Sequence, residues 1–294
     1  MIKEFMLMTM LTLLLVGIAG LVGALMGVSP ANAAMWGLLI SIPTNIITYL
    51  LSDKIVLMMT RAKIVSEYEA PRLHRIVEIV ARRAGIPKPK VAIVPSDVPN
   101  AFATGRGPSS AVVAVTRGAL ALFTDDELEA VIGHEISHIK HRDLFVATMA
   151  AVIASAVGWL AYMARWGAFV RAMGERDEES SGIALIALIA AILAPIFALM
   201  IQMAISRERE YKADEGSAYI TRKPLALISA LEKIEREVRR RGGVAMDVNP
   251  STSSLWIVNP FRGSTLMELF STHPPTWKRI ERLKRLAREL GIYR

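Results

Sequence analysis

The chain alternates between long uncharged apolar runs and segments rich in charge. No charged residue occurs from residue 5 to 52, and Pro30 and Asn32 interrupt this run near its middle. Two further uncharged runs cover residues 144–164 and 183–206. Because about 20 apolar residues span a bilayer as a helix, the pattern predicts four transmembrane helices in a 2 + 2 arrangement. The predicted spans are residues 5–28, 34–52, 144–164 and 183–206.

The charged segments between and after these runs predict a mainly α-helical domain with a small β-sheet. Helical spacing of apolar residues, short β-branched runs and Gly or Pro boundaries mark its elements. The predicted elements are a helix from Pro71 to Gly85, a strand at 90–94, a hairpin of 100–105 with 111–115, a helix that starts after Thr124 and runs through His138, a helix at 224–241, and a last basic helix that reaches about residue 290. Residues 242–263 form a loop that is a candidate lid.

Composition favours a membrane protein and limits its chemistry. Hydrophobic residues make up 53% of the 294 residues, and the mean hydropathy is +0.38, which is high for a soluble protein. There is no Cys, so disulfides and thiolate metal sites are excluded. The net charge of +8 does not indicate nucleic-acid binding, because basic and aromatic residues are not interleaved and no known module is present.

The basic residues instead predict an orientation in the membrane. Lys and Arg near spans collect on the cytoplasmic side of multispanning proteins. Both termini and the two charged segments are therefore predicted to be cytoplasmic, in a multi-pass protein of the cell (plasma or inner) membrane. The basic residues that flank the predicted spans on this side are Arg61, Lys63, Lys140, Arg142, Arg207, Arg209 and Lys212.

One motif on the predicted helix after Thr124 carries chemistry. Thr124 and Glu127 form a capping box that starts this helix. His134 and His138 are four residues apart, so they share a face and can reach one metal ion. Glu135, between them, can contact a water on that ion without being a ligand. This H-E-x-x-H pattern is that of zinc peptidases.

A catalytic zinc ion needs a third protein ligand, which the predicted topology suggests. The third and fourth spans form an antiparallel hairpin, so residues just before one and just after the other lie at the same height. Glu210 is thereby a candidate ligand, and Asp214, one turn later, can orient a histidine through its other ring nitrogen. The residues alone leave three competing ligands open, which are Glu208, Glu215 and Asp143.

The remaining histidines have simpler interpretations. His141 is expected to be solvated or to lie behind the ligands, and His74 is expected to lie on a helix surface. His273 precedes Pro274 and Pro275, which favour an extended entry into the last helix. A plain turn is one reading of His273.

Four motifs, in order, resemble the HtpX-type membrane zinc metalloproteases. This branch of the gluzincin peptidases also includes the prenyl-protein (CAAX-type) endopeptidases. The resemblance extends over nearly the full chain, including the four predicted spans. The motifs are Asn100-Ala-Phe-Ala-Thr-Gly105, Gly133-His-Glu-Ile-Ser-His138, Ser206-Arg-x-x-Glu-Tyr-x-Ala-Asp214 and Thr272-His-Pro-Pro275.

The resemblance implies a role for each motif. His134, His138 and Glu210 would bind one Zn²⁺ per chain, with Asp214 behind a histidine. Glu135 would be the catalytic base, and His273 would stabilise the oxyanion. Extended substrates would add to an exposed strand edge formed by Asn100, Ala101, Phe102, Ala103 and Thr104. The implied substrates are unfolded or damaged membrane proteins, cut at the cytoplasmic face of the bilayer in protein quality control and the stress response.

These predictions divide the chain into four parts. Two membrane helices lie in residues 1–60, and a second membrane hairpin lies in 144–206. The protease domain is assembled from 61–143, which holds the H-E-x-x-H helix, and from 207–294, which holds the third ligand. Two alternatives are a CAAX-type prenyl-protein endopeptidase and a non-enzymatic scaffold or transporter with a structural metal site.

Overall fold

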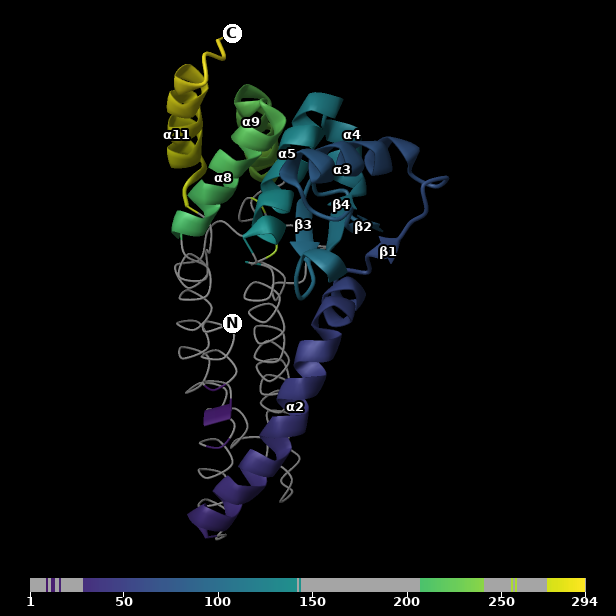
Figure 1. Ribbon diagram of the computed structural model, residues 1–294, viewed down its shortest axis with the longest axis vertical. Helices are drawn as coiled ribbons and strands as arrows, with labels where there is room; N and C mark the ends of the chain where they lie inside the picture. The colour runs from purple at the N-terminus through teal and green to yellow at the C-terminus, as the bar shows by residue number, and fades with distance from the viewer. Residues whose placement is uncertain are drawn as a thin grey trace, which may run out of the picture. The chain divides into compact units, whose positions relative to one another are not determined.

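The computed structural model describes residues 29–141, 143, 207–240, 255, 257 and 274–293, and the isolated residues 9, 12, 13 and 16. The chain divides into two compact units, Met1–Ser52 with Trp159–Pro195 and Asp53–Gly158 with Ile196–Arg294. The second unit contains the strands and the helices from α3 onward (Figure 1). The candidate site lies within it.

Helix α2 covers Pro30–Met59 and contains the predicted second span. It begins at Pro30, whose fixed φ suits a first helical turn, and it continues past the charged Asp53. No helix among the residues described is both long enough and apolar enough to cross a membrane. The predicted spans 5–28, 144–164 and 183–206 lie outside the described residues, apart from isolated positions. The four spans therefore stay a prediction.

A four-stranded mixed sheet has the order β1-β2-β4-β3. The predicted strand at 90–94 is confirmed, and so is the predicted hairpin, since β3 pairs antiparallel with β4. The short strand β1 and the parallel pairing of β2 with β4 were not predicted. The strands are β1 (Lys63–Ile64), β2 (Lys90–Val94), β3 (Ala101–Thr104) and β4 (Val112–Thr116).

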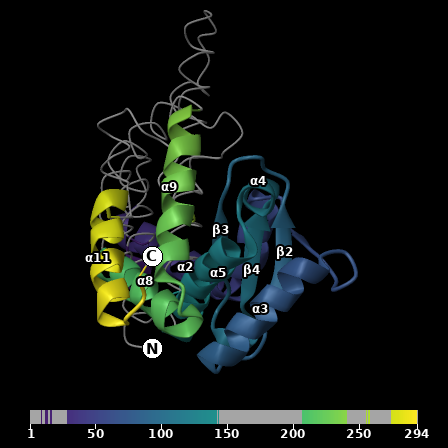
Figure 2. The same cartoon turned by 90° about the horizontal axis from the view of Figure 1, so that it is seen from above.

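The two faces of the sheet bury different cores, because successive side chains of a strand point to opposite faces. On one face, Val113 and Val115 of β4 pack in the main core with α3 and α5. On the other, Phe102 of β3 joins a smaller core with Val56, from the end of α2, and Leu255. Figure 2 shows α3 and α5 beside the sheet.

The predicted helices of the second unit are confirmed with small shifts of their ends. Helix α3 ends at Gly85, which adopts φ +73 as its C-cap, and α5 begins with the predicted capping box. The short helices α4 and η1 were not predicted. The helices are α3 (Pro71–Ala84), η1 (Pro108–Ser110), α4 (Arg117–Leu122), α5 (Asp125–Lys140), α8 (Arg207–Thr221), α9 (Pro224–Arg240) and α11 (Thr276–Glu289).

Ion pairs hold the first half of α5 between its neighbours. Glu127 accepts a hydrogen bond from Lys233 of α9 at 2.7 Å. Glu129 pairs with Lys223, just before α9, and with Arg83 of α3. Both glutamates are buried, and a buried carboxylate that loses its partner is costly. These pairs therefore fix α5 before it reaches the histidines.

Candidate metal centre

His134 and His138 of α5 face one another, as their spacing predicts. Their Nε2 atoms lie 3.2 Å apart. The side chain of His134 is 1% exposed and that of His138 is 14% exposed. Two imidazole nitrogens held this close beneath the surface form half of a metal-binding site.

Glu210 of α8 supplies the third candidate ligand. Its Oε1 lies 3.3 Å from Nε2 of His138, and its Oε2 lies 3.5 Å from Nε2 of His134. A tetrahedral ion with bonds of about 2.0–2.1 Å keeps its ligand atoms about 3.3–3.4 Å apart. The separations in the protein match that requirement, and two imidazoles with one carboxylate are a donor set that suits zinc. The structure thus brings His134, His138 and Glu210 together.

Small residues allow α8 to approach α5 closely enough for this contact. A Cβ at Gly133 of α5 would lie 2.6 Å from Cγ2 of Thr221 and 2.9 Å from Oγ of Ser217. A Cβ at Gly216 of α8 would collide with the side chain of Ser137. Ser217 also donates a hydrogen bond to the carbonyl of Ala130 at 2.6 Å. The distance between the helices, and hence the place of Glu210, depends on these contacts.

A carboxylate lies behind each histidine. Oδ1 of Asp214 is 2.9 Å from Nδ1 of His134, and its side chain is 4% exposed. Oδ2 of Asp143 is 3.7 Å from Nδ1 of His138, and its side chain is 22% exposed. A proton on Nδ1 that faces a carboxylate leaves the lone pair of Nε2 for a metal ion. Asp214 thus lies where the sequence predicted, and Asp143 lies behind His138.

Arg279 of α11 completes the centre and was missed in the sequence. It is 1% exposed and donates to both oxygens of Asp214, from Nε at 2.8 Å and from Nη2 at 2.6 Å. Its Nη1 donates to the carbonyl of Ile257 at 2.8 Å. The sequence did contain a signal, because Arg279 precedes Leu283 and Ala287 at four-residue steps. That spacing places Arg279 on the buried stripe of an otherwise basic helix.

The carboxylates govern the protonation of the metal-free centre. Burial disfavours the imidazolium of His138, but Glu210 and Asp143 outweigh this and raise its pKa to about 10. Burial opposes the charge of His134 as well, yet Asp214 and Glu210 raise its pKa too. Burial would raise the pKa of Asp214, but Arg279 holds it below its usual value. Positive charge is therefore strongly favoured between these side chains.

The other predicted site residues have varied outcomes. Glu135 is 5% exposed and lies beside His134 on α5. Two of the competing ligands, Glu208 and Glu215, are exposed on α8, and so is His141 at the end of α5. His273 lies outside the described residues.

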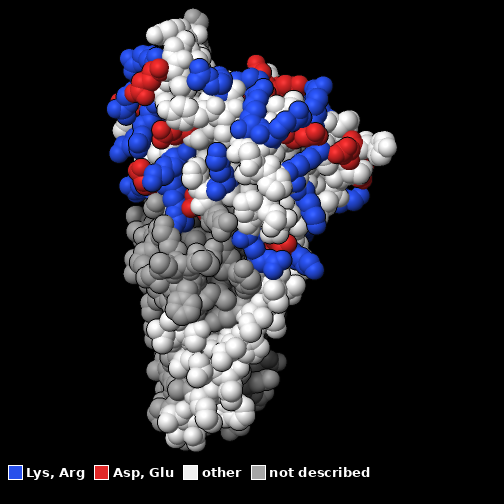
Figure 3. Space-filling model, in the orientation of Figure 1, with Lys and Arg blue, Asp and Glu red and all other residues white. Residues whose placement is uncertain are grey.

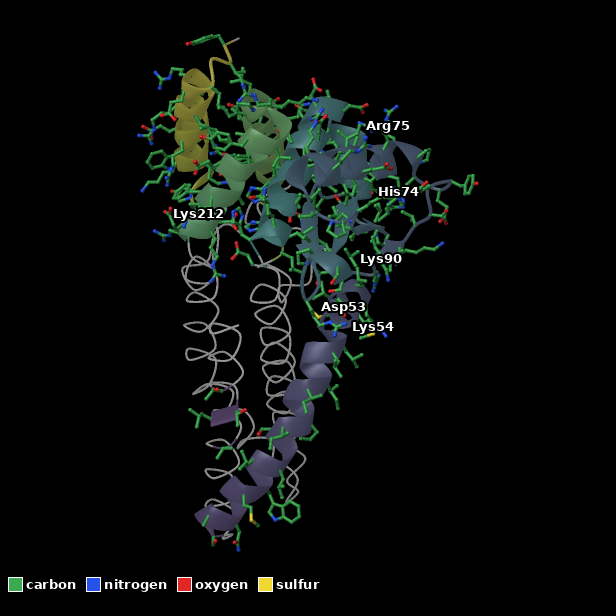
Figure 4. All side chains as sticks on the ribbon, viewed as in Figure 1. Asp53, Lys54, His74, Arg75, Lys90 and Lys212 are labelled. Carbon is green, nitrogen blue, oxygen red and sulfur yellow. The ribbon has the colours of Figure 1, made fainter. Side chains whose placement is uncertain are left out.

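Two expectations from the sequence are wrong. His74 is not a surface residue, because its side chain is 12% exposed and Nε2 lies 3.0 Å from the carbonyl of Val65 (Figure 4). The residues of β3 are not exposed either, although β3 does lie at an edge of the described sheet. Residues 101–104 are all buried, and Ala101 and Ala103 join the main core while Phe102 joins the smaller one. Asn100 is 2% exposed, and its amide bonds to the backbone of Leu255 and Ile257.

The site combines a buried metal-binding set of His134, His138 and Glu210 with a second glutamate, Glu135, that lies between the two histidines on α5. This combination defines a metallopeptidase. Residues 67–287 match the family described as Peptidase family M48, and the chain belongs to that family. It is 55% identical to a protease HtpX homolog of Pyrococcus abyssi over 99% of this chain and 97% of that protein. It is 49% identical to the protease HtpX homolog of Aquifex aeolicus over 95% of this chain and 90% of that one. The resemblance drawn from the motifs is confirmed, and the protein is a metal-dependent protease.

A solved structure is also similar. It is titled "Crystal Structure of S. mikatae Ste24p" and matches with a TM-score of 0.45 and 18% identity, over 85% of this chain and 58% of that chain.

Proposed function

We propose that the protein is a zinc-dependent endopeptidase of the cell membrane that cuts unfolded segments of membrane proteins at the cytoplasmic face. The observation that carries the proposal is the convergence of His134, His138 and Glu210. Their ligand atoms all lie within 4.8 Å of one another. A metal there would have three protein ligands and an open position, as catalytic zinc sites have.

The residues of the chain divide the work of hydrolysis. His134, His138 and Glu210 would hold the ion, while Asp214 keeps His134 in the tautomer with Nε2 free. When bound, zinc would polarise the scissile carbonyl and make water acidic enough to attack near neutral pH. Glu135 accepts the proton of the attacking water at its carboxylate and passes it to the leaving amine. We assign oxyanion stabilisation to His273 as a further part of this proposal.

Strand β3 supports a substrate that binds as an extended chain. Within the described residues it has β4 on one side and no strand on the other. Asn100 accepts a backbone hydrogen bond from Thr116 at 2.9 Å, so by alternation Ala101 and Ala103 direct their backbone groups away from β4. A peptide added there would be read mainly through its backbone. Because these residues are buried, it would first have to displace the atoms that cover them.

Exposed apolar side chains support a membrane location. Among the described side chains of α2 before Asp53, nine large apolar ones are exposed, which are Met35, Trp36, Leu38, Leu39, Ile42, Ile46, Ile47, Leu50 and Leu51. Such a surface favours contact with lipid. In Figure 3 the part of α2 before Asp53 carries no charge, whereas Lys and Arg are spread over the second unit. Figure 4 shows two of these exposed lysines, Lys54 and Lys212, and such flanks favour the cytoplasmic side.

Three glutamate variants test the mechanism on the full-length protein in detergent. Glu135→Gln should retain the metal and lose about 10²–10⁴-fold in peptide cleavage, since it removes a general base. Glu210→Gln should lose the metal itself. Glu208→Gln, on the exposed face of α8, is the matched control and should behave as wild type. Metal content by mass spectrometry and cleavage rate are measured together. Wild-type cleavage by Glu135→Gln would contradict the mechanism.

A second measurement tests the substrate class. The wild-type protease is given three substrates: an unfolded fragment of a membrane protein, that membrane protein folded in lipid vesicles, and a prenylated peptide. The proposal predicts cleavage of the unfolded fragment alone. Cleavage restricted to the prenylated peptide would replace the proposal with a prenyl-protein endopeptidase.

A further inference from the structure

Both polar atoms of the Asn100 side chain bind a distant part of the chain. Its Nδ2 donates to the carbonyl of Leu255 at 3.1 Å, and its Oδ1 accepts a hydrogen bond from the backbone N–H of Ile257 at 3.0 Å. Asn100, Leu255 and Ile257 are 2%, 4% and 2% exposed, respectively. A buried amide that bonds one donor and one acceptor to the same short segment fixes the place of that segment.

Packing anchors the same two residues on opposite faces of the sheet. Leu255 belongs to the smaller core with Phe102, whereas Ile257 belongs to the main core with the helices. Asn100 lies between these faces, immediately before β3. The two residues are thus held beside the start of β3 by side-chain burial on both faces and by the amide between them.

A continuous line of hydrogen bonds leads from this anchor to a metal ligand. The carbonyl of Ile257 accepts from Nη1 of Arg279 at 2.8 Å. Arg279 donates two further bonds to Asp214, and Asp214 lies 2.9 Å from Nδ1 of His134. The rigid fork of a guanidinium is oriented only when several of its donors are bound. The carbonyl of Ile257 binds one edge of this fork, and Asp214 binds the other.

We infer that Asn100 is a positioning residue for the metal centre, acting through Ile257, Arg279 and Asp214 on His134. This inference rests on the proposed function and assigns the Asn100 side chain a task other than substrate contact. Without the amide, the carbonyl of Ile257 is no longer fixed, and Arg279 can turn on its remaining contacts. The orientation of His134 then becomes less well defined, so metal binding and the rate of the chemical step both suffer.

The test compares Asn100→Ala with wild type and with Ser229→Ala. Ser229 donates to Glu127 at 2.6 Å and lies outside the line of contacts, so its variant controls for the loss of a partly buried hydrogen bond. For Asn100→Ala we expect kcat to fall and the metal dissociation constant to rise by about tenfold each, the lower end for groups behind metal ligands. KM for an unfolded peptide should change by less than about twofold. Ser229→Ala should change none of the three.

A second background shows whether the effect passes through Arg279. Arg279→Lys keeps the charge but cannot bind Ile257 and both oxygens of Asp214 together. In that background, Asn100→Ala should change metal affinity by less than about twofold, since coupled residues are not additive. Metal affinity is measured by chelator competition and so does not depend on activity. If Asn100→Ala does not fold, Asn100→Asp serves in its place, because it keeps the shape of the side chain, loses the donor to Leu255 and sets a carboxylate oxygen against that carbonyl, which loosens the segment.

Three results would overturn the inference. They are a raised KM with unchanged kcat, an effect of undiminished size in the Arg279→Lys background, and equal losses in Ser229→Ala. The first would make Asn100 a substrate contact, and the third would make its role purely structural. Failure of the proposed function is distinct, because wild type itself would then bind no zinc or cleave no peptide.

Discussion

Asp214→Asn is a sharp test of how the metal centre is held, because it changes charge and hardly changes shape. The carbonyl of asparagine can still accept the proton of His134 Nδ1, so the histidine keeps an acceptor. Arg279 loses its carboxylate partner and stays charged, at 1% exposure. Breaking a buried ion pair by removing one partner costs about 3–5 kcal/mol. The variant is therefore expected to be less stable without metal and to bind metal about 10- to 100-fold more weakly.

Asp143→Asn is the matched comparison, since the second histidine has its own carboxylate. Asp143 lies 3.7 Å from Nδ1 of His138, against 2.9 Å between Asp214 and His134. Its side chain is 22% exposed and also pairs with Arg209 at 3.5 Å, where water screens the charges. A longer, partly exposed pair is expected to contribute about 1 kcal/mol, the upper end for pairs that water reaches, so metal affinity should fall by no more than about fivefold.

Two assays separate these effects. Competition with a chromophoric chelator gives the metal dissociation constant, and thermal unfolding of chelator-treated protein gives the stability of the metal-free form. Asp214→Asn should raise the dissociation constant and lower the stability of the metal-free form. Asp143→Asn should raise the dissociation constant slightly and leave that stability nearly unchanged. Equal losses of affinity in the two variants would refute the view that burial and distance set the strength of these contacts.

Two further predictions concern packing and pH. Gly216→Ala places a methyl group against Ser137. It should therefore cost about 1–3 kcal/mol of stability and weaken metal binding by moving Glu210. Gly107→Ala is the control and should change neither property, because its new methyl group meets no atom within 4 Å. Chelator competition and thermal unfolding measure the two effects. Unchanged metal affinity in Gly216→Ala would show that α8 can shift without moving Glu210. The raised pKa of His138 stabilises the metal-free protein fully below its ordinary value of 6.5, and this stability is lost as pH rises to about 10. Chelator-treated protein should therefore melt at a lower temperature at pH 9.5 than at pH 6.5. Metal affinity should rise over the same pH range, because the metal binds neutral histidine. A melting temperature that does not change with pH would contradict the assigned contacts of His138.

Local signals in the sequence were enough to find the centre but not its supports. The capping box at Thr124 and the four-residue spacing of His134 and His138 depend only on one helix, and both are observed. Glu210 required a topological argument, because it lies on another helix. Arg279 and the Asn100–Ile257 contact join segments that are 65 and 157 residues apart, and no local pattern encodes such pairings. The burial of β3 escaped prediction for the same reason, since a strand edge in the sequence does not show what will cover it.

The charges buried in the centre argue for a divalent ion independently of the motif. Glu135, Glu210 and Asp214 are each at most 5% exposed, and Arg279 is the one Lys or Arg among the described residues that is buried. With neutral histidines, three carboxylates against one guanidinium leave about two negative charges away from water, which is strongly unfavourable. Protonation of His134 and His138 is one way to balance them, and the raised pKa of each histidine reflects this. A doubly charged cation between the same side chains balances them equally well and frees the Nε2 lone pairs for coordination, so metal and protons compete for one buried, negatively charged place.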